Sequence, residues 1–183
     1  QTQIGRAAAA LAAIERAASL DPLNAGVHRG VGWVQYFARR FDAAIAACRQ
    51  SIAINADVED SHGIIGDSLY QQGQFAEARA HYQKEPDALM GLTGLAIVAN
   101  RMGDGAAARA AQAKLQATLG AAATYQQAQI VAQWGDAEAA MGLLRQARAM
   151  SDSGLTLLAV DPMFDALRSR ADFIHLLKGL GFD

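Results

Sequence analysis

The sequence contains an internal repeat, and this repeat constrains the fold more than any other feature. A short corner, clearest where Gly73, Phe75 and Ala78 occur in QQGQFAEARAHY, has five copies. The copies are centred on Gly5, Arg39, Gly73, Gly103 and Gly135, which are 34, 34, 30 and 32 residues apart. Such a period is typical of proteins in which each unit is one supersecondary element that buries its apolar face against its neighbours.

The residues around each corner predict a hairpin of two helices. Small residues stand seven positions before the last four corners, at Gly32, Gly66, Ala96 and Ala128. Alanines stand five positions after all five corners, at Ala10, Ala44, Ala78, Ala108 and Ala140. Small side chains allow two helices to approach closely. The larger apolar residues near them lie three or four positions apart, which places them on one helical face.

The composition favours helices and no other regular structure. Hydrophobic residues make up 52% of the chain, and alanine, the best helix former, is abundant. The only three prolines, Pro22, Pro86 and Pro162, are far apart, so long helices are permitted. We find no convincing strand pattern. The sequence therefore predicts an all-α fold with a substantial core.

The charge, the cysteine count and the hydropathy exclude several classes of protein. The net charge is -2 and the pI is about 6.1, which does not provide the basic surface of a nucleic-acid-binding protein. A single cysteine, Cys48, cannot form an internal disulfide or a site with several cysteine ligands. No apolar run approaches the roughly 18 residues that span a bilayer. We expect no membrane segment in this chain.

The repeat resembles the tetratricopeptide repeat (TPR), whose period is 34 residues and whose unit is a helix hairpin. The resemblance implies a right-handed superhelical solenoid of antiparallel hairpins with a C-terminal helical cap. We expect a partial repeat at 1–24 and hairpins at 25–58, 59–88, 89–120 and 121–153. We expect the cap at 154–183. The family's tryptophan near the repeat start is replaced by His28 and His62.

The C-terminal segment resembles a more specific group. It contains Asp161-Pro162-x-Phe164-Asp165-x-Leu167-Arg168, followed by Phe173, Leu176 and Leu177. This pattern is similar to the tail of TPR domains in large bacterial signalling and transcription regulators, which carry a DNA-binding, cyclase or kinase domain elsewhere. The resemblance implies a regulatory or sensory module. We also expect a piece of a longer protein, since the chain opens at Gln1, and a cytoplasmic location, or a periplasmic one if the parent is anchored in a membrane.

The TPR resemblance also implies where a partner binds. In that family the first helix of each hairpin lines a concave groove that holds a peptide or a protein. The groove positions carried over to this chain are Arg29, Trp33, Tyr36, Asp67, Tyr70, Ile97, Asn100, Arg101, Tyr125 and Gln129, with Phe37 and Gln133 beside them. Trp, Tyr and Arg are frequent anchors of protein interfaces.

Two alternatives to an open groove remain. Trp33 and Phe37 can pack between helices instead of contacting a partner, and a flanking segment of the chain itself can fill the groove. The family's clamp for a terminal carboxylate is not expected, because Arg29 is the only suitable donor at the matching positions.

Catalysis, metal binding and cofactor binding are not expected. Gly66-Asp67-Ser68-Leu69 spells the opening motif of an esterase family, and Asp172 and His175 match its late Asp-x-x-His block. However, Ser68 falls in the middle of a predicted helix, where no base is positioned to activate it. His28 and His62 occupy one repeat position, but two ligands on one surface are too few for a closed zinc site. Gly103-x-Gly105 lacks the preceding strand, the third glycine and the lysine of a phosphate loop.

Two further functional hypotheses stay open. The same groove could hold a small molecule or peptide signal, which would make the chain a sensor. Two copies could also pair as a homodimer, because the half hairpin at 1–24 leaves an apolar face uncovered.

Overall fold

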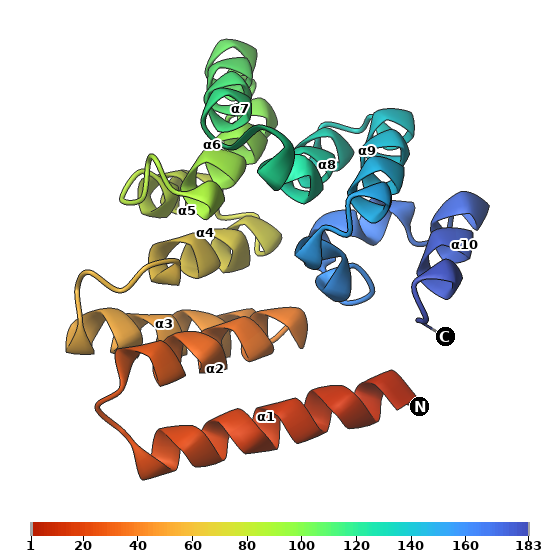
Figure 1. Ribbon diagram of the computed structural model, residues 1–183. Coiled ribbons are helices and arrows are strands. Elements are labelled where there is room, and N and C mark those ends of the chain that lie inside the picture. Colours follow the sequence, from red (N-terminus) through yellow and green to blue (C-terminus); the bar gives the residue numbers. More distant parts are fainter. Residues whose placement is uncertain (1, 183) are drawn as a thin grey trace. The chain divides into compact units, whose positions relative to one another are not determined.

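The computed structural model describes residues 2–182, with side chains from residue 9 onward, and every regular element in this range is helical. Figure 1 shows the helices in chain order. Their bounds are α1 (Thr2–Leu20), α2 (Ala25–Phe37), α3 (Phe41–Ile54), α4 (Ser61–Gln71), α5 (Phe75–Tyr82), α6 (Leu89–Arg101), α7 (Gly105–Leu119), α8 (Thr124–Gln133), α9 (Ala137–Ala149) and α10 (Ala171–Gly179), with short 3-10 helices η1 (Gly120–Ala123), η2 (Ser153–Leu157) and η3 (Pro162–Leu167). The expected all-α fold class is confirmed.

The chain forms two compact units, which divide between Gly91 and Leu92. In the first unit α2 packs against α3 and α4 packs against α5, and α1 covers part of α2. In the second unit α8 packs against α9, and η3 lies against α8. These three pairs of consecutive helices are thus hairpins.

Four of the five expected corners have one backbone geometry. Arg39, Gly73, Gly103 and Gly135 all have a positive φ, between 62° and 89°. At Gly135 the N–H of the corner donates to Ala132 O and the following N–H donates to Val131 O, and the other three corners repeat this pair. This is the Schellman ending of a helix, for which glycine is the favoured residue. Arg39 adopts the same φ at a cost of about 1–2 kcal/mol.

The fifth expected corner, at Gly5, is wrong. Helix α1 runs without interruption from Thr2 to Leu20, so Gly5 lies within a helix. The side chain of Ala7 lies outside the described part of the chain.

The small residues beside the corners are where paired helices touch. A Cβ added to Gly32 of α2 would lie 2.2 Å from Cys48 Sγ of α3, and one added to Gly66 of α4 would lie 2.5 Å from the Tyr82 ring of α5. The corresponding alanines of all four hairpins are also fully buried, namely Ala44, Ala78, Ala96, Ala108, Ala128 and Ala140. A larger side chain at these positions would separate the two helices.

The segment after α9 completes the second unit. Phe164 and Leu167 of η3 and Phe173 and Leu176 of α10 are buried in one cluster with Tyr125 and Leu144. The apolar positions expected to cover the last hairpin therefore do so. Among the described residues, no helix combines the length and the hydropathy that crossing a bilayer requires.

We predict opposite effects for alanine at two glycines of the α8–α9 hairpin. Gly135→Ala should destabilise the second unit by about 1–2 kcal/mol, because its φ of 89° is unfavourable for a residue with a Cβ. Gly142→Ala should stabilise it by up to about 1 kcal/mol, since Gly142 lies within α9 and an added Cβ would contact nothing. Chemical denaturation of both variants measures this. Equal effects would contradict the assigned corner.

We also predict that Cys48→Ala compensates for Gly32→Ala. Alone, Gly32→Ala should cost about 1–3 kcal/mol, because the new methyl group overlaps the Cys48 sulfur. In the double variant the sulfur is absent, so the measured loss should be smaller than the sum of the two single losses. A double-mutant cycle by urea denaturation tests this. Additive losses would show that the two positions do not touch.

Candidate functional site

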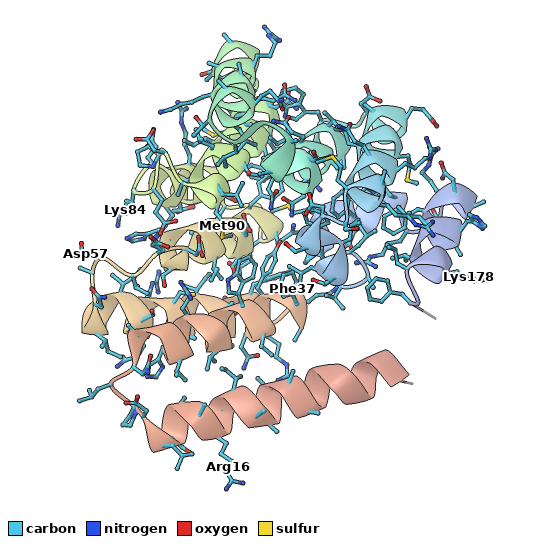
Figure 2. The ribbon with its side chains drawn as sticks, viewed as in Figure 1. Arg16, Phe37, Asp57, Lys84, Met90 and Lys178 are labelled. Carbon is cyan, nitrogen blue, oxygen red and sulfur yellow. The ribbon has the colours of Figure 1, made fainter. Side chains whose placement is uncertain are left out.

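Helix α2 presents a stripe of large side chains at intervals of one turn. Arg29, Trp33 and Phe37 are each partly exposed. The rings of Trp33 and Phe37 are stacked, with centroids 5.1 Å apart and planes 9° apart. Figure 2 marks Phe37 at the C-terminal end of α2. The stripe therefore offers an apolar platform with a cation at one end.

Two further aromatic rings, of which Tyr36 is buried and Phe41 is partly exposed, pack behind the platform. Tyr36 is buried and meets both Trp33 and Phe37 edge-on, at 6.1 and 5.2 Å. Phe41 of α3 lies 5.9 Å from Tyr36. Because Tyr36 has little exposed surface, its role in this structure is to hold the two exposed rings in place.

Arg29 has only weak partners within this unit. Its Nη1 donates to the Glu59 carbonyl over 3.3 Å, and it lies 3.9 Å from the Asp60 carboxylate. Both side chains are about one-third exposed, at 35% and 38%, so this ion pair contributes little to stability. Burial raises the pKa of the Asp60 carboxyl, and Arg29 opposes that effect. Most of the five N–H donors of the guanidinium are thus available to a ligand.

Helix α4, the first helix of the next hairpin, begins beside Arg29. The side chain that caps its N-terminus comes from Glu85, which follows α5 in the sequence. The Glu85 carboxylate accepts hydrogen bonds from the backbone N–H groups of His62 and Gly63, both at 3.1 Å. The residue at the usual capping position, Asp60, makes no such bond and has a φ of 64°. Glu85 therefore supplies the negative charge that a helix N-terminus favours. Its burial nevertheless raises the pKa of this carboxyl.

Two histidines link α4 to α5. The Nδ1 atoms of His62 and His81 are 3.0 Å apart, so one ring donates its Nδ1–H to the other. Burial and the nearby Lys84 lower the pKa of His62. Burial, His62, Lys84 and Arg49 lower the pKa of His81 to about 4. Both rings are thus neutral at pH 7, and protonating both would break their hydrogen bond.

We predict that this histidine pair makes the first unit sensitive to acid. Because folding lowers both pKa values, the stability that the pair contributes is complete above about pH 6.5 and is lost as the pH falls toward 4. The melting temperature of the wild type should therefore fall relative to a His62→Gln, His81→Gln variant over this range. Calorimetry at pH 7 and pH 4.5 measures the difference, and an unchanged difference would contradict the prediction.

In the second unit, the equivalent face of α8 is covered by the chain's own C-terminal segment. Counted back from the corners, Tyr125, Gln129 and Gln133 of α8 match Arg29, Trp33 and Phe37 of α2. Tyr125 Oη and Gln129 Nε2 donate to one carboxylate oxygen of Asp161, at 2.8 and 2.7 Å. Gln133 Nε2 donates to the Met163 carbonyl at 2.5 Å. The expected alternative, a groove surface filled by a flanking segment, therefore applies to α8.

Hydrogen bonds and aromatic packing hold the segment of residues 161–168 within the second unit. Asp161 is buried, and its other oxygen accepts from the Met163 N–H at 2.9 Å. Burial raises the pKa of this carboxyl, against the effect of its donors and of Arg168. Three residues later, Phe164 packs edge-on against Tyr125 with centroids 5.3 Å apart. Arg168 donates to the carbonyls of Ala159 and Asp161, which closes the loop.

The structure places the other predicted groove residues in two groups. Like Tyr36 and Tyr125, Tyr70 and Ile97 are buried and expose almost no surface to a ligand. Asn100 and Arg101 are exposed at the end of α6, and Asp67 of α4 is partly exposed and accepts from Tyr82 Oη at 2.8 Å. The roles of Glu85 and Asp161 were not predicted, because both lie in segments that follow a hairpin and are not part of the repeat. The His62–His81 contact was also not predicted, although both residues lie in the helices of one hairpin.

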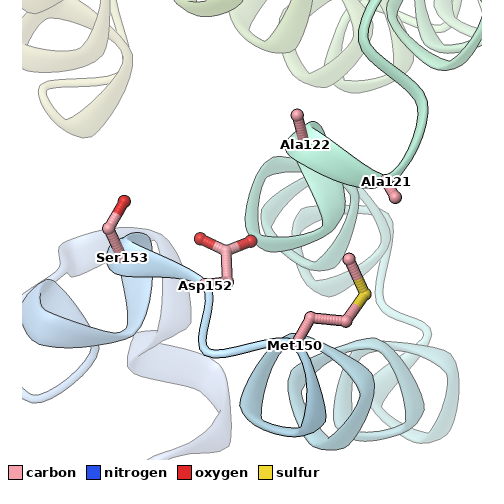
Figure 3. Close-up of a pocket in the computed structure, with 5 residues that line it drawn as sticks. All are labelled: Ala121, Ala122, Met150, Asp152 and Ser153. Atoms are coloured by element: carbon pink, nitrogen blue, oxygen red, sulfur yellow. The ribbon is translucent and has the colours of Figure 1, made fainter.

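A small hollow lies at the start of α8, and Figure 3 shows its lining. Its volume is about 260 Å³, and it is lined by Ala121, Ala122, Met150, Asp152 and Ser153. The Asp152 carboxylate is already engaged, since it accepts from the N–H groups of Tyr125 and Gly154 at 3.2 and 2.9 Å. Asp152 thus caps α8 as Glu85 caps α4. The side chains of Asp152 and Ser153 are the polar groups of its lining.

The esterase motif is poorly placed for catalysis. Ser68 is fully buried within α4, and its hydroxyl donates to Ile64 O of its own helix at 2.8 Å. Asp172 pairs with Arg170, while His175 is exposed on α10. Among the described residues, no three His, Cys, Asp or Glu side chains gather closely enough to bind a metal ion.

Comparison with known proteins supports the fold. No protein-family model and no curated protein matches the sequence. The structure is similar to that of YrrB, described as a TPR protein with an unusual peptide-binding site. The similarity covers 97% of this chain and 86% of that one, with a TM-score of 0.51 and 17% sequence identity. The chain therefore has a TPR-like fold, as its repeat predicted.

Proposed function

We propose that this chain is a protein- or peptide-binding module and that the Arg29, Trp33 and Phe37 stripe of α2 is its contact surface. The observation that carries the proposal is the stacked and partly exposed Trp33–Phe37 pair beside a weakly engaged Arg29. Aromatic rings held rigidly by packing lose little conformational freedom on binding, and Trp and Arg dominate many interfaces.

The similarity to YrrB supports the same function, because that protein shares the fold and has a peptide-binding site. The proposed surface excludes the four buried side chains among the predicted groove residues. It includes Arg29, Trp33 and Phe37, with Asp67 as a neighbour on the next hairpin. Asn100, Arg101 and Gln129 belong to the second unit, where Gln129 is already bonded to Asp161.

The C-terminal pattern supports a regulatory role within a larger bacterial signalling protein. In that role the module would recruit a partner while another domain acts. A cytoplasmic location is part of this proposal. The sensor alternative uses the same surface, with a small molecule in place of a peptide.

We predict that random peptides selected for binding to the wild type will lose affinity for a Trp33→Ala, Phe37→Ala variant. The loss should be at least about tenfold, since truncating a central aromatic anchor costs about 2 kcal/mol or more. A Leu20→Ala, Leu23→Ala variant is the matched control, because these side chains are 75% and 78% exposed elsewhere in the same unit. Circular dichroism verifies that all proteins remain helical.

Selection of peptides that bind both variants equally would place the binding site elsewhere. Failure to select any peptide, together with a thermal shift caused by a small molecule that requires Trp33, would favour the sensor alternative.

A further inference from the structure

The second unit contains an example of how a helix of this repeat holds a peptide segment. Within that unit, two donors one turn apart on α8 bind a single carboxylate, that of Asp161. The aromatic residue three positions later, Phe164, packs against the first donor's ring. The bound segment is Asp161-Pro162-Met163-Phe164, and it enters η3 as it leaves the carboxylate.

Only one other first helix has donors at the same two positions. These positions lie ten and six residues before each corner, and the corners share one backbone geometry. They are occupied by Arg29 and Trp33 in α2, Gly63 and Asp67 in α4, Thr93 and Ile97 in α6, and Tyr125 and Gln129 in α8. A guanidinium and an indole N–H can donate to a carboxylate as a phenol and an amide do. Arg29 adds a positive charge, which strengthens such a bond.

The donors of α2 lack a strong acceptor within their unit. The indole N–H of Trp33 makes no hydrogen bond in the described part of the chain, and Arg29 is 3.9 Å from its nearest carboxylate. The third position differs, since Phe37 replaces Gln133 and stacks on Trp33. A ligand at α2 would therefore gain an apolar contact where the segment at α8 has a hydrogen bond to its backbone carbonyl.

We propose that the α2 stripe binds an acidic peptide segment in which one Asp precedes a proline and an apolar or aromatic residue, as in the chain's own Asp161–Phe164. The Asp carboxylate accepts from Arg29 and Trp33, and the residue two positions after it, which corresponds to Met163, packs on the Trp33–Phe37 stack. This proposal rests on the proposed function and specifies the chemistry of the partner.

Two acidic groups beside Arg29 weaken the binding of an acidic ligand, and changing them gives a further test. Asp60 competes for Arg29, and Glu59 adds a further negative charge beside it. Neutralising Asp60 should therefore strengthen binding, whereas neutralising Arg29 should weaken it. A surface that simply attracts apolar peptides would respond to neither change.

The probe is a fluorescein-labelled peptide with blocked ends and the sequence AVDPMFDAL, which is that of residues 159–167. Fluorescence polarisation measures its binding to the full chain. Changing its first Asp to Asn should weaken binding about tenfold or more, since a hydrogen-bonded charge contributes about 1.5–3 kcal/mol. Arg29→Gln should cause a similar loss, and Asp60→Asn should increase the affinity severalfold.

The outcomes separate this inference from the proposed function. If the Asn peptide binds as well as the Asp peptide, or if Arg29→Gln has no effect, the acidic-ligand proposal is wrong. It is also wrong if binding depends on Gln129 instead of Arg29, because the probe would then exchange with the chain's own segment. In either case, selected neutral peptides that require Trp33 would leave the proposed function intact, and their absence would remove it.

Discussion

The structure depends on the close contact between the two helices of each hairpin. In the first unit this contact is so tight that a Cβ on Gly32 or Gly66 would overlap a side chain of the second helix. In the second unit, Ala96 and Ala128 stand at the equivalent positions and are fully buried. Because interiors are packed at near-crystalline density, these small residues determine how far apart the helices lie. The four equivalent corners then turn each second helix back along the first.

This regularity makes residues in different hairpins comparable. A position counted from one corner corresponds to the same position counted from another, so the contacts of α8 indicate what α2 can do. At α8 the chain's own Asp161–Phe164 segment occupies that face and is buried in the core of the second unit. At α2 the matching residues stay partly exposed, and the aromatic pair is held rigid by Tyr36 beneath it. The two units thus use one arrangement for two purposes, internal packing and the proposed recognition of a partner.

The repeat in the sequence was sufficient to predict the helices, four of the corners and the small residues where helices meet. Which groove positions are exposed was not predicted, since Tyr36, Tyr70, Ile97 and Tyr125 are all buried. Tyr36 and Tyr70 pack against Phe41 and Phe75, which lie one repeat apart, so the burial of these two follows the repeat. Tyr125 is instead covered by Phe164 of the C-terminal segment, which lies outside the repeat. The distant capping carboxylates of Glu85 and Asp152 were also not predictable, since each lies in an irregular segment after a hairpin. The Gly5 corner failed because a single small residue in an alanine-rich stretch is compatible with an uninterrupted helix.

The most direct test of the central claim uses the two tryptophans of the chain as separate probes. Trp134 donates its indole N–H to Ala96 O at 3.1 Å inside the second unit, whereas the indole of Trp33 lies on the proposed surface. Nitrogen-15 labelling of the two indole groups therefore gives one signal from the hydrogen-bonded Trp134 and one from the site. On titration with the Asp-containing peptide, the Trp33 signal should shift to saturation while the Trp134 signal stays in place. A Trp33 signal that does not move at saturating peptide would contradict the account.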